Sequence, residues 1–307
     1  MAFITVLTQV LMVFALMAVG VLSNRLHFLH DDAARDITKI LIYFVSPCVI
    51  LRAFDQPFSR ARASGLLVSF GGVVALFVLS IIAARLIFRP RMIPDADRRR
   101  VLEFGTVYSN AGFMGVPLLQ AVMGAQGIFY GTPYLAVFNL FCWTHGSSLY
   151  EGKPDRKTAW KILCNPNIIA IAAGLAMFLC AVRLPSLVSI GIGYLYNLNT
   201  PLSMIVIGNS LARLHPRTLL ADRSIWPGVL MRNLSIPLAA FVVFRFTGLP
   251  RAVWMPTILL SACPVAGYCV LFAGVHGKDT AFPTRMMALS TLLSVVTIPL
   301  VVGLAAL

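Results

Sequence analysis

The chain has 307 residues, of which 59% are hydrophobic and only 12% are charged, and its mean hydropathy is +0.85. A soluble domain of this length needs far more charge on its surface, so the composition places the chain among membrane proteins. The net charge of +14 would suggest a nucleic-acid partner in a soluble protein. Here the basic residues form short clusters between apolar runs and no zinc-finger spacing occurs, so we expect no nucleic-acid partner.

Ten apolar runs are long enough, at about 20 residues each, to cross a lipid bilayer. They cover residues 2–23, 34–54, 65–88, 101–123, 127–147, 165–182, 187–211, 226–246, 252–274 and 283–306. The first run has no basic start and no cleavage site, which predicts a retained span rather than a signal peptide. Because lipid cannot satisfy free backbone groups and no alternating strand pattern occurs, we expect an all-α polytopic membrane protein of ten transmembrane helices.

Lysine and arginine are distributed unevenly between two sets of loops. Eighteen of them lie in or beside the loops that follow every odd-numbered span, and six lie in the other loops. Because basic loops stay in the cytoplasm, this asymmetry predicts a protein of the cell membrane, a bacterial inner membrane, with both termini on the outer side. Arg232 belongs to neither set, since it falls inside the eighth span.

Two short patterns recur at nearly the same spacing. Residues 42–47 resemble residues 196–201, with an offset of 154, and residues 109–115 resemble residues 261–267, with an offset of 152. The matches predict a first five-helix repeat at 1–150, a short cytoplasmic linker at 151–164 and a second five-helix repeat at 165–307. Because five is odd, the two repeats would be inverted, which is a common plan for transporters. Chance similarity between apolar segments is the alternative.

The fourth span carries strong helix breakers near its middle. Gly112, Gly115 and Pro117 lie within six residues of each other. Proline removes a backbone donor and clashes one turn back, and glycine weakens the helix further. We therefore expect the helix to break near residues 110–115, about 14 Å into a hydrocarbon core of roughly 30 Å.

The ninth span is predicted to break at the corresponding place, because Pro264, Ala266 and Gly267 follow one another closely there. Broken helices 4 and 9 would then cross at mid-membrane, and such a matched pair points to a transport site. Each break exposes a helix N-terminus, whose free N–H groups and partial positive charge favour an anion. The alternative is a pair of proline kinks that serve packing alone.

Several polar side chains lie inside the spans. Asn110 is predicted either to hold a substrate carboxylate or to cap the freed backbone of its own helix. Asn199 and Thr200 are candidates for lining the site, as is Ser46, for which a kink with a back-bonded hydroxyl is the other interpretation. Asn209 shares a span with Asn199, and two amides in one span rarely face lipid. Hydrogen bonding between helices would also explain both amides.

Charged groups within the spans are few. Glu103 and Arg232 are expected to snorkel or to form ion pairs near the interface. Arg232 would either anchor its helix or attract anions at a cytoplasmic vestibule. His145 is either a proton carrier or a structural, hydrogen-bonded histidine. The pair 165–166, Asn-Pro, is interpreted as a helix cap followed by proline in the first turn.

No pair of carboxylates lies deep within a span, so we do not expect an acidic proton or sodium site. Backbone carbonyls at the breaks could still hold Na⁺. Coupling to H⁺ or Na⁺ is left open, and neither a metal site nor a cofactor is expected.

Three stretches of the chain resemble the auxin efflux carrier family, whose bacterial members are described as malonate or dicarboxylate transporters. They are SNAGFMGVP at 109–117, NPNIIA at 165–170 and PVA at 264–266, and the resemblance extends over essentially the whole chain. It implies ten helices in two inverted repeats, with broken helices 4 and 9 crossing near a central site, as in bile acid sodium symporters.

By matching position, the resemblance assigns Asn110, Pro117 and Pro264 to the crossing. It also implies movement of organic anions that carry carboxylates. Plant relatives have a long central cytoplasmic loop, whereas the corresponding loop here consists only of residues 149–161. Auxin itself is therefore not an expected substrate.

We accordingly predict a secondary active transporter of small organic anions, with the lipid bilayer and the anion as its partners and a homodimer left open. The predicted substrate-binding residues are Asn110, Gly112, Gly115, Pro117, Pro264, Ala266, Gly267, Asn199, Thr200 and Ser46. An organic-anion channel or a ligand-sensing membrane protein without turnover is the alternative. An enzyme is not expected, because no catalytic constellation such as HExxH lies within the spans and His145, the deep histidine, has no acidic neighbour in sequence.

Overall fold

A computed structural model of the chain describes residues 2–151, 160, 164–212, 222–246 and 248–306. In this part of the chain every predicted span coincides with helix, and the only β-structure is one isolated bridge. Six helical segments of the described chain are long and apolar enough to cross a membrane, and two further apolar helices are shorter. The class of multi-pass helical membrane protein is confirmed. The inverted ten-helix arrangement stays a prediction, and most of the linker 151–164 lies outside the described residues.

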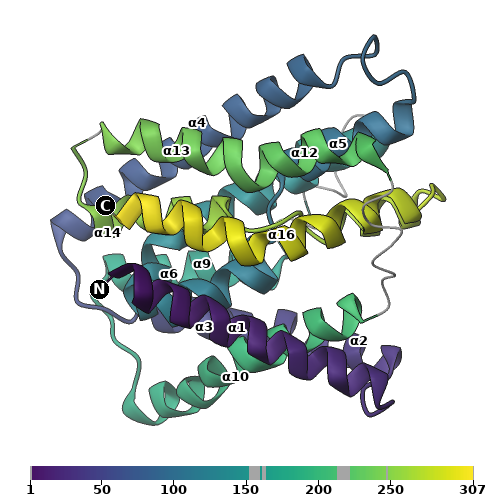
Figure 1. Cartoon of the computed structure of the whole chain (residues 1–307). Helices are drawn as coiled ribbons and strands as arrows, with labels where there is room; N and C mark the ends of the chain where they lie inside the picture. Colours follow the sequence, from purple (N-terminus) through teal and green to yellow (C-terminus); the bar gives the residue numbers. More distant parts are fainter. Residues whose placement is uncertain (1, 152–159, 161–163, 213–221, 247, 307) are drawn as a thin grey trace.

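The helices form two groups, and we call the first group A. Group A comprises α1 (Ala2–Arg25), α2 (Asp31–Ile40), η1 (Leu41–Val45), α3 (Ser46–Phe54), α9 (Pro166–Leu179) and α10 (Ser186–Leu211). In this group α10 packs along both α1 and α3, and α3 packs along α9. Helices α1, α2, α3 and α10 occupy the lower part of Figure 1.

Group B contains both interrupted segments. It comprises α4 (Arg60–Ile87), α5 (Ala96–Val107), η2 (Ala111–Gly115), α6 (Val116–Phe141), η3 (Cys142–Gly146), α7 (Ser147–Glu151), η4 (Arg223–Ile225), α12 (Trp226–Leu230), η5 (Met231–Ser235), α13 (Ile236–Arg245), α14 (Arg251–Ser261), α15 (Tyr268–Val275) and α16 (Ala281–Ala306). Helix α6 packs against α4 and α14, and α16 packs against α14 and α15. The two groups meet where α16 contacts α1 and where α6 contacts α3, α9 and α10.

Prolines follow three of the four π-helical turns in the described part of the chain. Pro47, Pro117 and Pro237 each stand in the first turn of a helix that is preceded directly by a π-helical turn, η1, η2 and η5 respectively. A proline has no N–H, and its ring clashes with the carbonyl one turn back. The hydrogen bonds of that turn therefore change from the i→i+4 pattern of an α-helix to the i→i+5 pattern of a π-helix. Gly124 has a φ of 60° and divides α6 into two helices, which separates the fourth predicted span from the fifth.

Both chain ends lie at the same end of the molecule (Figure 1). Ion pairs join several of the basic segments to one another: Arg98 lies 3.5 Å from Asp222, and Lys278 lies 3.3 Å from Asp97. The Ser224 hydroxyl, with help from Arg98, lowers the pKa of the Asp222 carboxyl. Which end faces the cytoplasm stays a prediction from the charge count. Six of the counted residues lie outside the described residues: Lys153, Arg156, Lys157, Lys161, Arg213 and Arg217.

Candidate functional site

The two interrupted segments cross and pair with each other through their backbones. Helix α5 ends at Val107, where the chain becomes extended at Tyr108, and α14 ends at Ser261, where a turn follows at Ala262. Ser109 and Val265 form an antiparallel bridge. The N–H of Asn110 donates to the Pro264 carbonyl at 2.6 Å, and the N–H of Ala266 donates to the Tyr108 carbonyl at 2.9 Å. This pairing satisfies backbone groups that an interrupted helix would otherwise bury without partners.

The interruption of the ninth predicted span lies where the sequence indicates, between Ser261 and Tyr268. In the fourth predicted span it lies at residues 108–110, at the start of the expected range rather than across it. Gly112 and Gly115 belong to the π-helical turn η2 instead of to extended chain. The physical reason is that Pro117 widens the turn before it, while the break itself forms where the backbone can pair with the other segment.

Side chains from neighbouring helices fix the crossing. The Ser109 hydroxyl lies 2.9 Å from the Tyr134 hydroxyl. The N–H of Val265 donates to Ser290 Oγ at 3.0 Å, and Ser290 Oγ donates in turn to Asn233 Oδ1 at 2.6 Å. The crossing is therefore held by α6, α16 and η5 as well as by its own backbone.

Arg232 does not snorkel to the interface, so the expectation of an interfacial anchor is wrong, while its attraction of anions stays a prediction. Its side chain is 0% exposed. Nη1 donates to the carbonyls of Thr106 and Val107 at 3.0 and 2.8 Å, and Nη2 donates to the carbonyl of Ser261. These carbonyls belong to the last turns of α5 and α14, so the buried guanidinium caps the C-termini of both interrupted helices.

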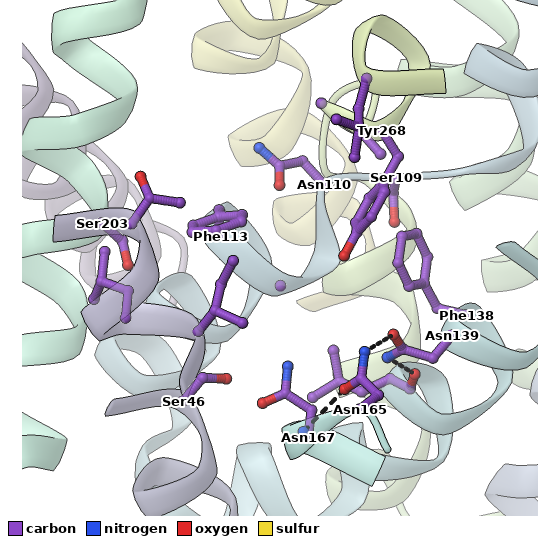
Figure 2. A pocket seen from close by; sticks show the side chains of 18 of the residues that line it. Ser46, Ser109, Asn110, Phe113, Phe138, Asn139, Asn165, Asn167, Ser203 and Tyr268 are labelled. Carbon is purple, nitrogen blue, oxygen red and sulfur yellow. Dashed lines mark hydrogen bonds between the residues drawn. The ribbon is translucent and has the colours of Figure 1, made fainter. Parts of the chain in front are cut away.

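A cavity of about 260 Å³ lies beside the crossing, between the two groups (Figure 2). Its walls from group A contain Thr38, Leu41, Ile42, Ser46, Asn165, Asn167, Asn199 and Ser203. Its walls from group B contain Ser109, Asn110, Gly112, Phe113, Leu135, Phe138, Asn139, Ala266, Gly267, Tyr268 and Leu271. None of these described residues carries a formal charge, and five of them are asparagines. The volume is near the lower end of the range for small-molecule pockets.

Three helix N-termini border the cavity. η2 begins at Ala111 after Asn110, α15 begins at Tyr268 after Gly267, and α9 begins at Pro166 after Asn165. The N–H groups of a first helical turn lack partners within the helix and carry partial positive charge. An uncharged cavity with these N-termini on its walls favours an anionic group.

Six of the predicted site residues line the cavity and four do not. The lining residues are Ser46, Asn110, Gly112, Asn199, Ala266 and Gly267. Pro264 forms the crossing, and the Pro117 carbonyl accepts a hydrogen bond from Thr200 Oγ1 at 3.5 Å. Gly115 lies against α14, because a Cβ at this position would stand 2.5 Å from a Leu260 methyl carbon. Those four residues take part in the packing around the crossing and do not line the cavity.

The Asn110 side chain makes no capping hydrogen bond to its own helix, so the capping interpretation is wrong. The side chain lies at the cavity wall (Figure 2). The other predicted amides do bond between helices: Asn199 Nδ2 donates to Gln120 Oε1 at 3.4 Å. Asn209 Oδ1 accepts from Asn24 Nδ2 at 3.0 Å, away from the cavity.

Sequence reasoning missed a row of three amides on the cavity wall. Asn165 caps α9 as predicted, since its Oδ1 accepts from the N–H of Asn167 at 2.9 Å. Its Nδ2 also donates to Asn139 Oδ1 at 3.2 Å, which joins group A to group B (Figure 2). The buried Oδ1 of Asn167 has no partner within the described structure. The cap motif was the available signal, but it carries no information about the partner on α6.

Two titratable side chains discussed from the sequence lie outside the cavity lining. His145 Nδ1 is 2.9 Å from the Tyr108 hydroxyl, as expected of a hydrogen-bonded histidine, and its role as a proton carrier stays untested. Glu103 is partly buried and lies 4.0 Å from Arg99. Within the described residues no cluster of three or more His, Cys, Asp or Glu side chains suits a metal ion.

A helical membrane protein with two interrupted segments that cross beside an amide-lined cavity has the features of a transporter. Comparison with known families is in agreement. The chain belongs to the auxin efflux carrier family, whose sequence model is described as membrane transport protein and matches residues 5–159 and 153–302. It is also 27% identical over 313 residues to an uncharacterized transporter of Methanothermobacter thermautotrophicus, with 95% of each chain covered. The chain is therefore a membrane transporter, and membership of this family indicates a protein that is not an enzyme.

Proposed function

We propose that this transporter is a secondary carrier that moves small organic anions, mono- or dicarboxylates, by alternating access around the crossed segments. The observation that carries the proposal is the meeting of three helix N-termini at one uncharged cavity between groups A and B. Their partial positive charges, together with the amide side chains of the cavity wall, would replace the water around a carboxylate.

The cavity chemistry supports an anion rather than a cation. Amide side chains offer N–H donors to a carboxylate, and no acidic side chain lies among the described lining residues to hold a cation. The volume of about 260 Å³ suits a molecule of a few carbon atoms. Phe113, Phe138 and Tyr268 supply apolar surface for the carbon skeleton.

Alternating access requires that one side of the cavity be closed while the other is open. Hydrogen bonds join the groups at the edge of the cavity: Gln120 Nε2 donates to the Tyr196 carbonyl at 3.1 Å, and Asn199, a lining residue, donates to Gln120. Thr200 bonds to Pro117 in the same region. We propose that these contacts form the closed gate on the outer side and that they separate when group B moves against group A.

The anion assignment is tested by a thermal-shift screen of detergent-purified protein. We expect malonate, succinate, malate or lactate to raise the melting temperature of the wild type. Asn110→Ala should weaken the affinity for the stabilising acid at least about tenfold, because a hydrogen bond to a charged group is worth roughly 1.5–3 kcal/mol. Stabilisation by sugars or inorganic cations alone would contradict the assignment.

The gate is tested by cross-linking in a variant whose six native cysteines are replaced. We expect Gln120→Cys with Asn199→Cys to form an oxidative cross-link that stops uptake into proteoliposomes, and reduction to restore it. Each single cysteine variant serves as the control and should be insensitive to oxidant. A cross-linked protein that still transports would refute the gate. Absence of saturable counterflow of labelled substrate would instead favour an anion channel.

A further inference from the structure

The charge of Arg232 is buried at the crossing without a carboxylate to balance it. No acidic side chain lies within ion-pair distance of the guanidinium among the residues that the structure describes. Its guanidinium donates hydrogen bonds to three backbone carbonyls, and its Nε has no partner in the described structure. A buried charge costs several kcal/mol unless something compensates it, so this arrangement requires a physical reason.

The compensation comes from the two helix C-termini. Each helix end carries about half an elementary charge, negative at the C-terminus and positive at the N-terminus. The C-termini of α5 and α14 therefore present together about one negative charge, and the guanidinium bonds to both. With Arg232 in place the negative ends are neutralised. The positive N-termini of η2 and α15 then face the cavity without opposition.

The guanidinium lies close enough to the cavity for its charge to act there. The Tyr134 side chain interacts with Arg232, and its hydroxyl lies 2.9 Å from Ser109 Oγ. Ser109 is itself a lining residue of the cavity. The surroundings are buried and low in water, so a charge there acts more strongly than at a surface.

We propose that Arg232 is a positioning residue that sets the charge preference of the cavity. By cancelling the partial negative charges of the two helix C-termini, the guanidinium makes the crossing net positive. An anion with two charges is therefore bound more strongly than an anion with one. This inference rests on the proposed transport of organic anions. Arg232 acts through the helix ends and does not itself line the cavity.

A purely structural role would predict something different. Loss of the Arg232 hydrogen bonds would then loosen the crossing. The affinity for every ligand would fall by the same factor, whatever its charge. Asn233 provides the comparison, because it is the next residue on η5 and supports the crossing through Ser290 without carrying a charge. Asn233→Ala should therefore disturb the geometry and leave the electrostatics unchanged.

The test uses three ligands of nearly one shape: malonate with two charges, its monoamide with one charge, and malonamide with none. Binding is measured calorimetrically on purified full-length protein at a pH where malonate is a dianion. For Arg232→Gln we expect about a tenfold loss of affinity for the monoamide and about a hundredfold loss for malonate, since the Coulomb energy scales with ligand charge. For Arg232→Lys, which keeps the charge, the ratio of the two affinities should stay within about threefold of the wild type.

Asn233→Ala should lower the affinities for malonate and for the monoamide by equal factors. Equal losses for both anions in Arg232→Gln would overturn the inference while leaving anion transport intact. If Arg232→Gln does not fold, Arg232→Met, which also removes the charge, takes its place with the same expected losses. In Arg232→Lys a changed affinity ratio despite the retained charge would also overturn the inference. A wild type that binds malonamide as tightly as malonate would overturn the proposed function, and the inference with it.

Discussion

Gly208→Ala should lower the apparent melting temperature of the detergent-purified protein by about 5–10 °C, which corresponds to roughly 3 kcal/mol for a chain of this size. The reason is the contact between α1 and α10 in group A. A Cβ on Gly208 would stand 1.9 Å from the Met17 carbonyl oxygen, and a Cβ on Gly20 would stand 2.1 Å from the Ile205 carbonyl oxygen. Each glycine faces the backbone of the opposite helix, as small residues do where membrane helices approach closely.

The clash cannot be relieved by a side-chain rotation, because the opposing atoms belong to backbone. The helices must separate, which would also strain the Asn24–Asn209 hydrogen bond of the same seam. Gly191→Ala on the same helix is the matched control, since a Cβ there meets no atom within 4 Å. Its melting temperature should stay close to that of the wild type. Equal melting temperatures for the two variants would show that this seam does not limit stability.

Local sequence signals were sufficient to predict the interrupted segments. Pro264 and Gly267 interrupt the ninth predicted span because proline and glycine act on the hydrogen bonds of their own turn. The same reasoning placed the other break a few residues late, across Gly112 and Gly115. Its true position depends on pairing with Val265, a residue more than 150 positions away, and no local rule contains that pairing.

The role of Arg232 could not be predicted for a related reason. Interior arginines of membrane helices are expected to reach an interface or a carboxylate, and the sequence shows no acidic residue beside Arg232. Its actual partners are backbone carbonyls, at Val107 and Ser261, which every residue possesses and which a sequence does not distinguish. Only the break of both helices next to the guanidinium makes those carbonyls available.

The cavity wall was predictable only in part. Asn110 and Asn199 were identified because amides are costly inside a membrane span, and both line the cavity. The Asn-Pro pattern predicts Asn165 as a helix cap, and that prediction is confirmed. Its second hydrogen bond, to Asn139, requires that α9 and α6 lie side by side, which is a property of the tertiary packing.

Asn110→Asp should abolish binding of organic anions while leaving the fold intact. The substitution changes almost no volume, and a carboxylate at the N-terminus of η2 is electrostatically favourable for the helix. Toward the ligand the effect is opposite. At a separation of roughly 6 Å and an effective dielectric constant of about 20, each ligand charge is opposed by about 3 kcal/mol, or about a hundredfold in affinity.

Ser59→Asp is the matched control for this charge. Ser59 caps α4, where its hydroxyl accepts from the N–H of Arg62 at 3.2 Å, and it does not line the cavity. The control adds the same negative charge at a helix N-terminus, and its affinity for malonate should equal that of the wild type. An Asn110→Asp protein that binds malonate normally would remove Asn110 from the site. A variant that instead gains affinity for a cation would mean that the sign of the cargo depends on this one side chain, because the surrounding helix ends would then be too weak to exclude a positive charge.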